Sequence, residues 1–250
     1  NNQSKYSIMK RISLFCLSLL IGFTASAQWG KKIRGNGEMV TEERQLGPYD
    51  EVSVSGWFDV ELTDGNEGDL TLYGEENLLE YLETEVKGGK LTIKTRAGYR
   101  LQPSSWKSGG IKITVPVEDI NALSMSGSGD IRGKTRLRAE HMELGMSGSG
   151  DMQLSVDAGS MEVTLSGSGD MELQGSCGIL EVRVSGSGDV SAYGLEAREV
   201  DAMVSGSADI QVTATESLKA RVSGSGDITY RGNPGKIDTK TSGSGDIQKG

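Results

Sequence analysis

The sequence is poor in cysteine, proline and aromatic residues. Its 250 residues include two Cys and four Pro, and 5% are aromatic. Cys16 lies in an apolar N-terminal run, which leaves Cys177 without a partner for an internal disulfide. The lack of proline argues against collagen and against a proline-rich disordered chain. Only Tyr193 and Tyr230 are aromatic beyond residue 120, so the second half cannot build a core of large rings.

Excess positive charge is also absent. The chain has 26 Lys and Arg against 35 Asp and Glu, a formal net charge of −9. Affinity for nucleic acid depends on clustered basic residues that neutralise phosphates. Nucleic acid is therefore excluded as a partner.

Long hydrophobic runs are missing as well. The longest nearly unbroken one, residues 12–23, is shorter than the roughly 20 residues that a membrane helix needs. It follows Met9-Lys10-Arg11 and precedes Ala25-Ser26-Ala27, a pattern typical of a secretory signal peptide. An uncleaved anchor is the alternative. We expect residues 1–27 to be upstream residues plus a signal peptide starting at Met9. Residues 28–250 then form a single domain that is periplasmic, surface-exposed or secreted, and spans no membrane after cleavage.

Glycine is abundant, and its placement reveals a repeat. Of 36 glycines, 22 follow residue 120. Ser-Gly-Ser-Gly-Asp occurs six times, and a seventh copy has Ala208 in place of the second glycine. The copies end at Asp130, Asp151, Asp170, Asp189, Asp209, Asp227 and Asp246. Their spacing of 18–21 residues indicates a repeat architecture.

The segments between the motifs alternate with a period of two. Met161, Val163 and Leu165, for example, are separated by Glu162 and Thr164. Such alternation predicts strands with one buried face. A unit of about 19 residues with short strands predicts one coil of a parallel β-solenoid, stacked about 4.8 Å from the next. The alternative, a propeller or sandwich, normally uses Asn-Gly or Asp-Gly hairpin turns, which the array lacks.

Two roles are predicted for the motif glycines. Alanine at position 208 indicates that the second glycine position faces inward and has room only for a small residue. The first glycine is invariant in all seven copies, so we expect it to adopt the positive φ that other residues avoid. These structural turn positions are Gly127, Gly148, Gly167, Gly186, Gly206, Gly224 and Gly243.

Residues 28–120 have a different texture and are expected to form degenerate coils and a cap. Residues 52–62 carry Ser-Gly-x-x-Asp between alternating strands, which makes them a degenerate first copy of the repeat. We expect further strands at residues 70–74, 91–94 and 111–116, and a short helix at residues 75–82. The loop 102–110 contains Trp106. Trp106 and Tyr99 are the candidate binding residues, since exposed aromatic rings can stack on ligands.

The repeated aspartates are the clearest candidate site outside this module. Stacked coils would place them in a row in which each neighbouring pair repels by about 0.9 kcal/mol even at the dielectric of water. Hydrogen bonds from backbone N–H groups or serine hydroxyls of the same turn would offset this repulsion. A calcium ion that bridges neighbouring carboxylates is the alternative, and no other cofactor is expected.

Several motifs together resemble a known family. They are residues 54–60 (Val-Ser-Gly-Trp-Phe-Asp-Val), 74–79 (Gly-Glu-Glu-Asn-Leu-Leu), 113–116 (Ile-Thr-Val-Pro) and the Ser-Gly-Ser-Gly-Asp repeat. Over residues 38–248 the chain resembles the head GIN domain family, also called putative auto-transporter adhesins. The resemblance implies a right-handed parallel β-helix, export across the inner membrane and no established catalytic residues.

The residues and the resemblance favour a non-catalytic, adhesin-like or structural binding module at the cell envelope. Every coil repeats the same carboxylate, whereas catalysis needs one place where carboxylates differ in environment. His141 and Cys177 lack repeated partners. A polysaccharide-active β-helix enzyme and a cation-stabilised scaffold are the alternatives. The expected partner is a protein or glycan of the envelope, and an open last coil predicts end-to-end self-association or coverage by the N-terminal segment.

Overall fold

The computed structural model describes residues 30–106 and 110–250. The predicted signal peptide lies outside these residues. Strands make up about 70% of the chain and helix about 2%, so the predicted all-β class is confirmed. Within the described ranges, no helix has the length and apolar character needed to cross a membrane.

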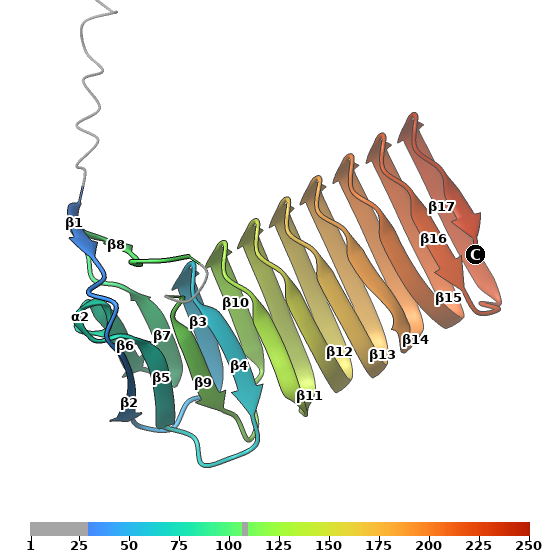
Figure 1. The fold of residues 1–250 in the computed structure, drawn as a ribbon. Coiled ribbons are helices and arrows are strands. Elements are labelled where there is room, and N and C mark those ends of the chain that lie inside the picture. Colours follow the sequence, from blue (N-terminus) through green and yellow to red (C-terminus); the bar gives the residue numbers. More distant parts are fainter. Residues whose placement is uncertain (1–29, 107–109) are drawn as a thin grey trace, which may run out of the picture.

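The second half is a rod of stacked coils (Figure 1). Its strands are β10 (Ala122–Gly127), β11 (Ile131–Gly148), β12 (Met152–Gly167), β13 (Met171–Gly186), β14 (Val190–Gly206), β15 (Ile210–Gly224), β16 (Ile228–Arg231), β17 (Lys236–Gly243) and β18 (Ile247–Lys249). Each coil pairs in parallel with the next, so that Met152 lies beside Met171 and Met171 beside Val190. The predicted parallel solenoid with coils of about 19 residues is confirmed.

The alternating sequence produces a thin core of stacked side chains. In β12 buried and outward-facing residues alternate, with Met161, Val163 and Leu165 at 2% exposure or less. The register continues from coil to coil apart from local shifts, so that core residues such as Met161, Leu180 and Val200 lie in one column along the rod. Hydrophobic burial at about 25 cal/mol per Å² stabilises this core in place of disulfides or large rings.

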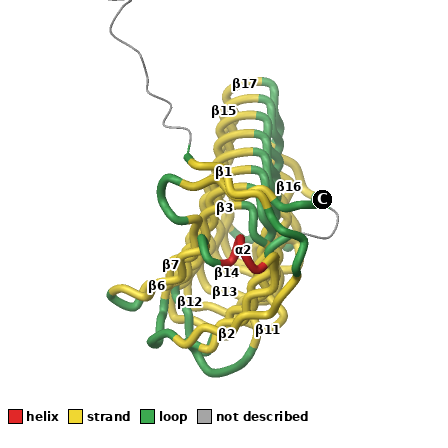
Figure 2. The backbone as a smooth tube through the Cα atoms, turned by 60° about the vertical axis from the view of Figure 1, so that its left-hand side comes forward, coloured by secondary structure: helices red, strands yellow, loops and turns green. Residues whose placement is uncertain are grey.

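The N-terminal module closes one end of the rod (Figures 1 and 2). Its elements are β1 (Lys31–Arg34), β2 (Met39–Gln45), β3 (Glu51–Gly56), β4 (Asp59–Thr63), β5 (Asp69–Glu75), α2 (Glu76–Leu79), β6 (Leu82–Lys87), β7 (Lys90–Thr95), β8 (Tyr99–Gln102) and β9 (Lys112–Pro116). β3 pairs in parallel with β10, and β4 with β11, as the degenerate first copy of the repeat predicts. The helix is shorter than predicted, and it buries Leu78 and Leu79.

The corner of each coil is where glycine is required. The first glycine of every motif copy has a φ between 129° and 141°. At Gly148 an added Cβ would also lie 1.9 Å from the carbonyl oxygen of Gly127 in the preceding coil. The second glycine does not have positive φ, and Ala208 fills that position fully buried. The corner therefore uses its first glycine for backbone conformation and its second for lack of bulk.

The inward-facing positions of the last coil are exposed and partly polar. The core columns that contain Ala220 and Val222 continue as Thr239 and Thr241. Ile237, beside the buried Leu218, is 50% exposed. The prediction that the N-terminal segment covers this coil is wrong for the described residues, because β1 pairs with β8 at the opposite end of the rod (Figure 1).

Candidate functional site

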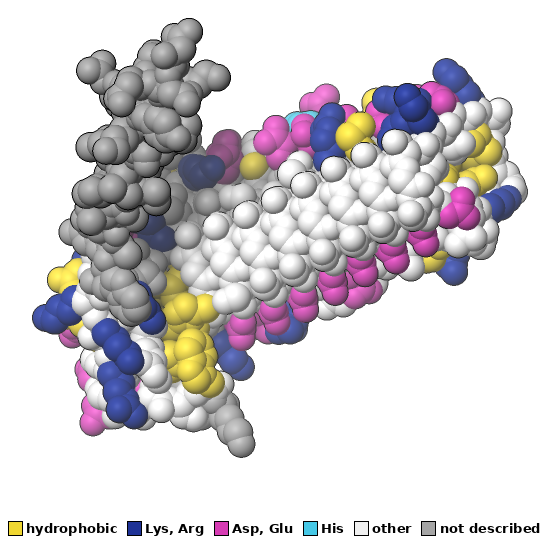
Figure 3. Space-filling model, turned by 90° about the horizontal axis from the view of Figure 1, so that it is seen from above, with side chains coloured by type: hydrophobic (Ala, Val, Ile, Leu, Met, Phe, Trp, Pro, Cys, Tyr) yellow, Lys and Arg dark blue, Asp and Glu magenta, His cyan; other side chains and the backbone are white. Residues whose placement is uncertain are grey.

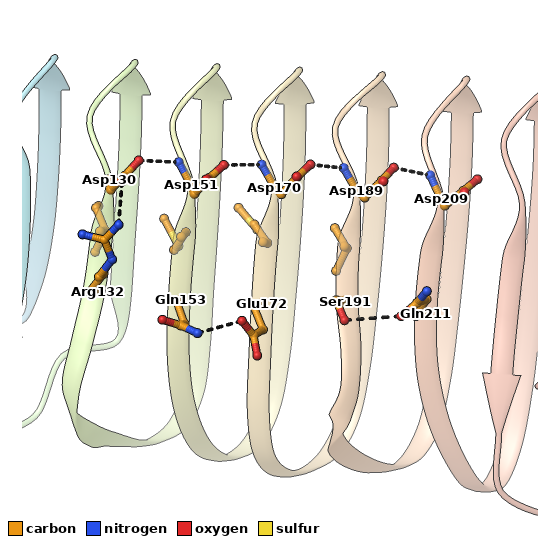
Figure 4. Close-up of a pocket in the computed structure, with 14 residues that line it drawn as sticks. Asp130, Arg132, Asp151, Gln153, Asp170, Glu172, Asp189, Ser191, Asp209 and Gln211 are labelled. Atoms are coloured by element: carbon orange, nitrogen blue, oxygen red, sulfur yellow. Dashed lines mark hydrogen bonds and ion pairs between the residues drawn. The ribbon is translucent and has the colours of Figure 1, made fainter.

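A groove runs along one side of the rod, beside the aspartate row (Figure 4). It has a volume of about 560 Å³, and its floor includes Met152, Met171 and Val190. Outward side chains from successive coils form its two walls. The first wall is Asp130, Asp151, Asp170, Asp189 and Asp209, and the second is Arg132, Gln153, Glu172, Ser191 and Gln211.

Each aspartate of the row except Asp246 accepts a hydrogen bond from the next coil. The backbone N–H of Asp170 donates to Asp151 Oδ1 at 3.1 Å, and that of Asp189 to Asp170 Oδ1 at 2.9 Å (Figure 4). The same bond recurs from Asp130 to Asp246 at 2.7–3.3 Å. The prediction of donors within the same turn is therefore wrong for all but Asp246, whose Oδ1 accepts the N–H of Ile247. The carboxylates act as clamps between coils.

The row begins one coil before the seven repeated aspartates. Asp59 Oδ1 accepts the N–H of Asp130 at 3.3 Å, so the row begins in the N-terminal module. In the described part of the chain, no group of three or more His, Cys, Asp or Glu side chains is placed to hold a metal ion. The row is thus arranged to accept backbone hydrogen bonds, and calcium remains a prediction for experiment.

The second wall mixes donors and acceptors. Arg132 donates to Asp130 Oδ2 at 2.8 Å, and Gln153 Nε2 donates to Glu172 at 2.7 Å. Ser191 Oγ lies 3.4 Å from Gln211 Oε1. This wall therefore presents a guanidinium, amide, hydroxyl or carboxylate group in each successive coil.

The groove continues into the N-terminal module. A second hollow of about 250 Å³ shares Arg132 with the first and is lined by Asp59, Glu61, Tyr73 and Lys112 among others. Strand pairing aligns Tyr73 with Lys112, and Lys112 with Asp59, at the head of the aspartate row. Tyr73 is 43% exposed. Pairing likewise extends the second wall through Glu61 to Thr114 and Thr71. The two walls thus cross eight strands, from β5 to β15.

A flat serine face adjoins the aspartate row. Figure 3 shows this face as a broad area without charged or hydrophobic side chains, with acidic groups along one long edge. The two serines of each motif copy are exposed on it. At its head, Trp57 occupies the position that Ser128 has in the next coil, since Gly56 pairs with Gly127 and Val60 with Ile131.

The two aromatic residues singled out from the sequence lie in separate clusters. Trp106 is 67% exposed, and its ring centroid is 5.2 Å from that of Trp57. Tyr99 instead packs on Tyr81, with ring centroids 4.6 Å apart, and Arg96 lies over the Tyr81 ring. Trp106 is therefore placed beside the serine face, whereas Tyr99 belongs to the β1–β8 side of the module.

Glu75 stabilises the N-terminal end of the groove, and the sequence analysis did not identify it as a site residue. It is fully buried, and its carboxylate accepts the backbone N–H groups of Gly37 and, at 2.7 Å, Ser104. It ends β5, two residues after Tyr73, and Ser104 lies two residues before Trp106. Glu75 thus connects the segment that carries Tyr73 with the segment that carries Trp106.

His141, its partner Ser160 and Cys177 lie outside the groove. His141 Nδ1 is 2.9 Å from Ser160 Oγ, and Nε2 is 3.5 Å from Glu143. All three are partly or fully exposed, and His141 and Ser160 sit opposite each other in paired strands. Burial raises the pKa of the Cys177 thiol to about 11, which keeps it in its unreactive protonated form.

The fold and groove define a parallel β-solenoid with one long polar groove. The chain belongs to the family described as putative auto-transporter adhesin, head GIN domain, whose sequence profile matches residues 48–234, and the resemblance seen in the sequence is confirmed. No curated protein matches the chain.

Solved structures share the fold over most of this chain. A putative adhesin from Bacteroides fragilis is 26% identical, with a TM-score of 0.76 over 87% of this chain and 99% of its own. A putative lipid binding protein from Parabacteroides distasonis is 29% identical, with a TM-score of 0.73 over 88% of this chain and 100% of its own. A putative adhesin from Parabacteroides merdae, 18% identical with a TM-score of 0.70 over 88% of this chain and 99% of its own, shares the fold.

Proposed function

We propose that this protein is an exported, non-catalytic binding module of the cell envelope that holds its ligand along the groove. The observation that carries the proposal is the continuity of the two polar walls across eight strands. A rigid, repetitive surface of this kind suits recognition of an extended ligand. The apolar N-terminal run with its small-residue cleavage pattern supports export.

The relatives support an adhesive role more than a catalytic one. The Bacteroides fragilis structure is named as a putative adhesin, and the family is described as putative auto-transporter adhesins. The Parabacteroides distasonis structure is named as a putative lipid binding protein. The groove carries the same carboxylate in successive coils, and this uniformity favours binding over acid–base chemistry, which uses carboxylates in unlike environments.

Binding to envelope material tests the proposal. The purified mature chain is incubated with a glycan array and with outer-membrane fractions, in parallel with Trp106→Ala and with Tyr73→Ala. The proposal expects retention on one of these materials and weaker retention of at least one variant. If the wild type is retained on neither material, the proposed function is wrong. Cell fractionation checks export, which predicts protein outside the cytoplasm.

A further inference from the structure

We propose that the groove binds an uncharged linear polysaccharide lying along the rod axis, with the ring of Tyr73 as its stacking surface. This inference rests on the proposed function and names the ligand class. Three observations carry it: the spacing of the polar groups, the aromatic ring at the groove's head and the charge of the walls.

The polar groups recur at the spacing of the coils, about 4.8 Å. In each clamp of the row, Oδ1 is the oxygen that accepts the next coil's N–H. Among the described residues, the second oxygen, Oδ2, has no hydrogen-bond donor at Asp151, Asp170 and Asp189, whereas that of Asp130 accepts a hydrogen bond from Arg132. A carboxylate oxygen can accept hydroxyl groups, while Gln153 and Gln211 both donate and accept through their amides. A chain with hydroxyl groups at regular intervals matches such a surface.

Tyr73 supplies the apolar part of the interaction. It is one of the few large hydrophobic residues that are more than 40% exposed in the described structure, and it lines the hollow that extends the groove. Lys112 and Asp59 follow it in the row, and Thr71 and Thr114 lie at the end of the second wall. The ring face of a tyrosine buries the apolar face of a sugar ring, and its hydroxyl stays available for a hydrogen bond.

The charge of the walls selects among extended ligands. Carboxylates outnumber Arg132 and Lys112 along the groove, so an anionic polysaccharide or an anionic lipid surface is repelled. Binding to a lipid surface normally uses basic residues and a broad apolar face, and this groove offers neither. A basic polymer would be attracted, but it would bind through charge and release at high salt. Stacking and uncharged hydrogen bonds are much less sensitive to salt.

The test uses the full mature chain and an array of linear oligosaccharides, from dimers to octamers. The neutral members are β-1,4-glucan, fully acetylated chitin, xylan and mannan oligomers. The charged comparisons are polygalacturonate oligomers, deacetylated chitin oligomers and anionic phospholipid vesicles. We expect a neutral series to bind, with affinity rising with chain length and little changed by salt.

Matched variants place the ligand in the groove. Tyr73→Ala should weaken binding by about tenfold, the effect of losing one stacked ring. The pair Gln153→Ala and Gln211→Ala, three coils apart, should remove the gain from long chains while leaving short ones unchanged. Tyr99→Ala, a tyrosine outside the groove, is the control and should bind as the wild type does. Thermal melting confirms that each variant is folded.

Three results would overturn the inference. One is preference for a charged oligomer or for vesicles, and another is equal binding by Tyr73→Ala and Tyr99→Ala. The third is retention on outer-membrane fractions with no binding to any neutral oligosaccharide, which leaves the proposed function standing. Failure on both materials rejects the proposed function as well.

Discussion

Each aspartate of the row affects stability in two opposing ways, through repulsion by its neighbours and through the hydrogen bond that it accepts. Replacing one aspartate separates these two effects. Asp170 repels the carboxylates of Asp151 and Asp189, and each pair contributes about 0.9 kcal/mol at a spacing of about 4.8 Å in water. It also accepts the N–H of Asp189 at 2.9 Å. A hydrogen bond to a charged group is worth about 1.5–3 kcal/mol, and a neutral one about 0.5–1.5 kcal/mol.

Asp170→Asn keeps an acceptor and removes both repulsive pairs. The loss of about 1 kcal/mol in the hydrogen bond is offset by relief of up to about 1.7 kcal/mol, so its free energy of unfolding should stay within about 1 kcal/mol of wild type. Asp170→Ala gains the same relief but loses the acceptor. It should be about 1 kcal/mol less stable than Asp170→Asn.

Chemical denaturation of the two variants measures this difference directly. The triple replacements at Asp151, Asp170 and Asp189 should enlarge it to about 3 kcal/mol, if the sites are additive. High salt should stabilise the wild type more than the triple asparagine variant, because salt screens the repulsion. Equal stability of the alanine and asparagine variants would refute the clamp. Calcium that raises the melting temperature of the wild type alone would favour a bridged row instead.

Three further predictions test other parts of the fold. Gly186→Ala should lower the free energy of unfolding by at least about 2 kcal/mol, because φ is +137° and the new Cβ would lie 2.3 Å from the carbonyl oxygen of Gly167. Ala208→Gly should lower it by no more than about 1 kcal/mol. Similar losses for the two variants in chemical denaturation would contradict the two roles of the corner glycines. Glu75→Gln should destabilise by about 2 kcal/mol or more, since an amide cannot accept both backbone N–H groups in that buried position, and an unchanged melting temperature would count against the anchor. The Cys177 thiol, 6% exposed and with a pKa of about 11, should react with iodoacetamide at pH 8 only after denaturation, and rapid labelling of the native protein would show that this part of the core is open.

The repeat made the rod predictable from the sequence. Seven motif copies at nearly constant spacing define the coil, and period-two alternation such as Met161, Val163 and Leu165 defines the buried face. Because parallel stacking aligns equivalent residues, the repeat also predicts the aspartate row. The degenerate copy at residues 52–62 was recognisable because it keeps Gly56 and Asp59 in the same frame.

The head of the groove could not be predicted in this way. Tyr73, Lys112 and Asp59 come together through one antiparallel and one parallel pairing between strands about 40–50 residues apart, and no local pattern specifies such pairings. Tyr73 therefore read as an ordinary strand residue. The sequence indicates only that Glu75 begins a short helix, because burial of its carboxylate depends on the segments around Gly37 and Ser104.

The donors to the aspartate row were also beyond the sequence. Both a bond within the turn and a bond to the next coil satisfy the same carboxylate, and only the side-chain direction decides between them. The positions of the coils place the next N–H within 2.7–3.3 Å of Oδ1. The sequence therefore identifies the aspartates as structural acceptors, but it does not identify the N–H groups that donate to them.

Methionine methyl NMR tests the central claim, that the ligand lies in the groove, most directly. Met152 and Met171 lie in the groove floor, whereas Met203 is 43% exposed outside it. Titration with the neutral oligosaccharide that binds most tightly should shift the Met152 and Met171 signals and leave Met203 unchanged. Shifts at Met203 without shifts at Met152 and Met171 would place the ligand elsewhere and contradict the account.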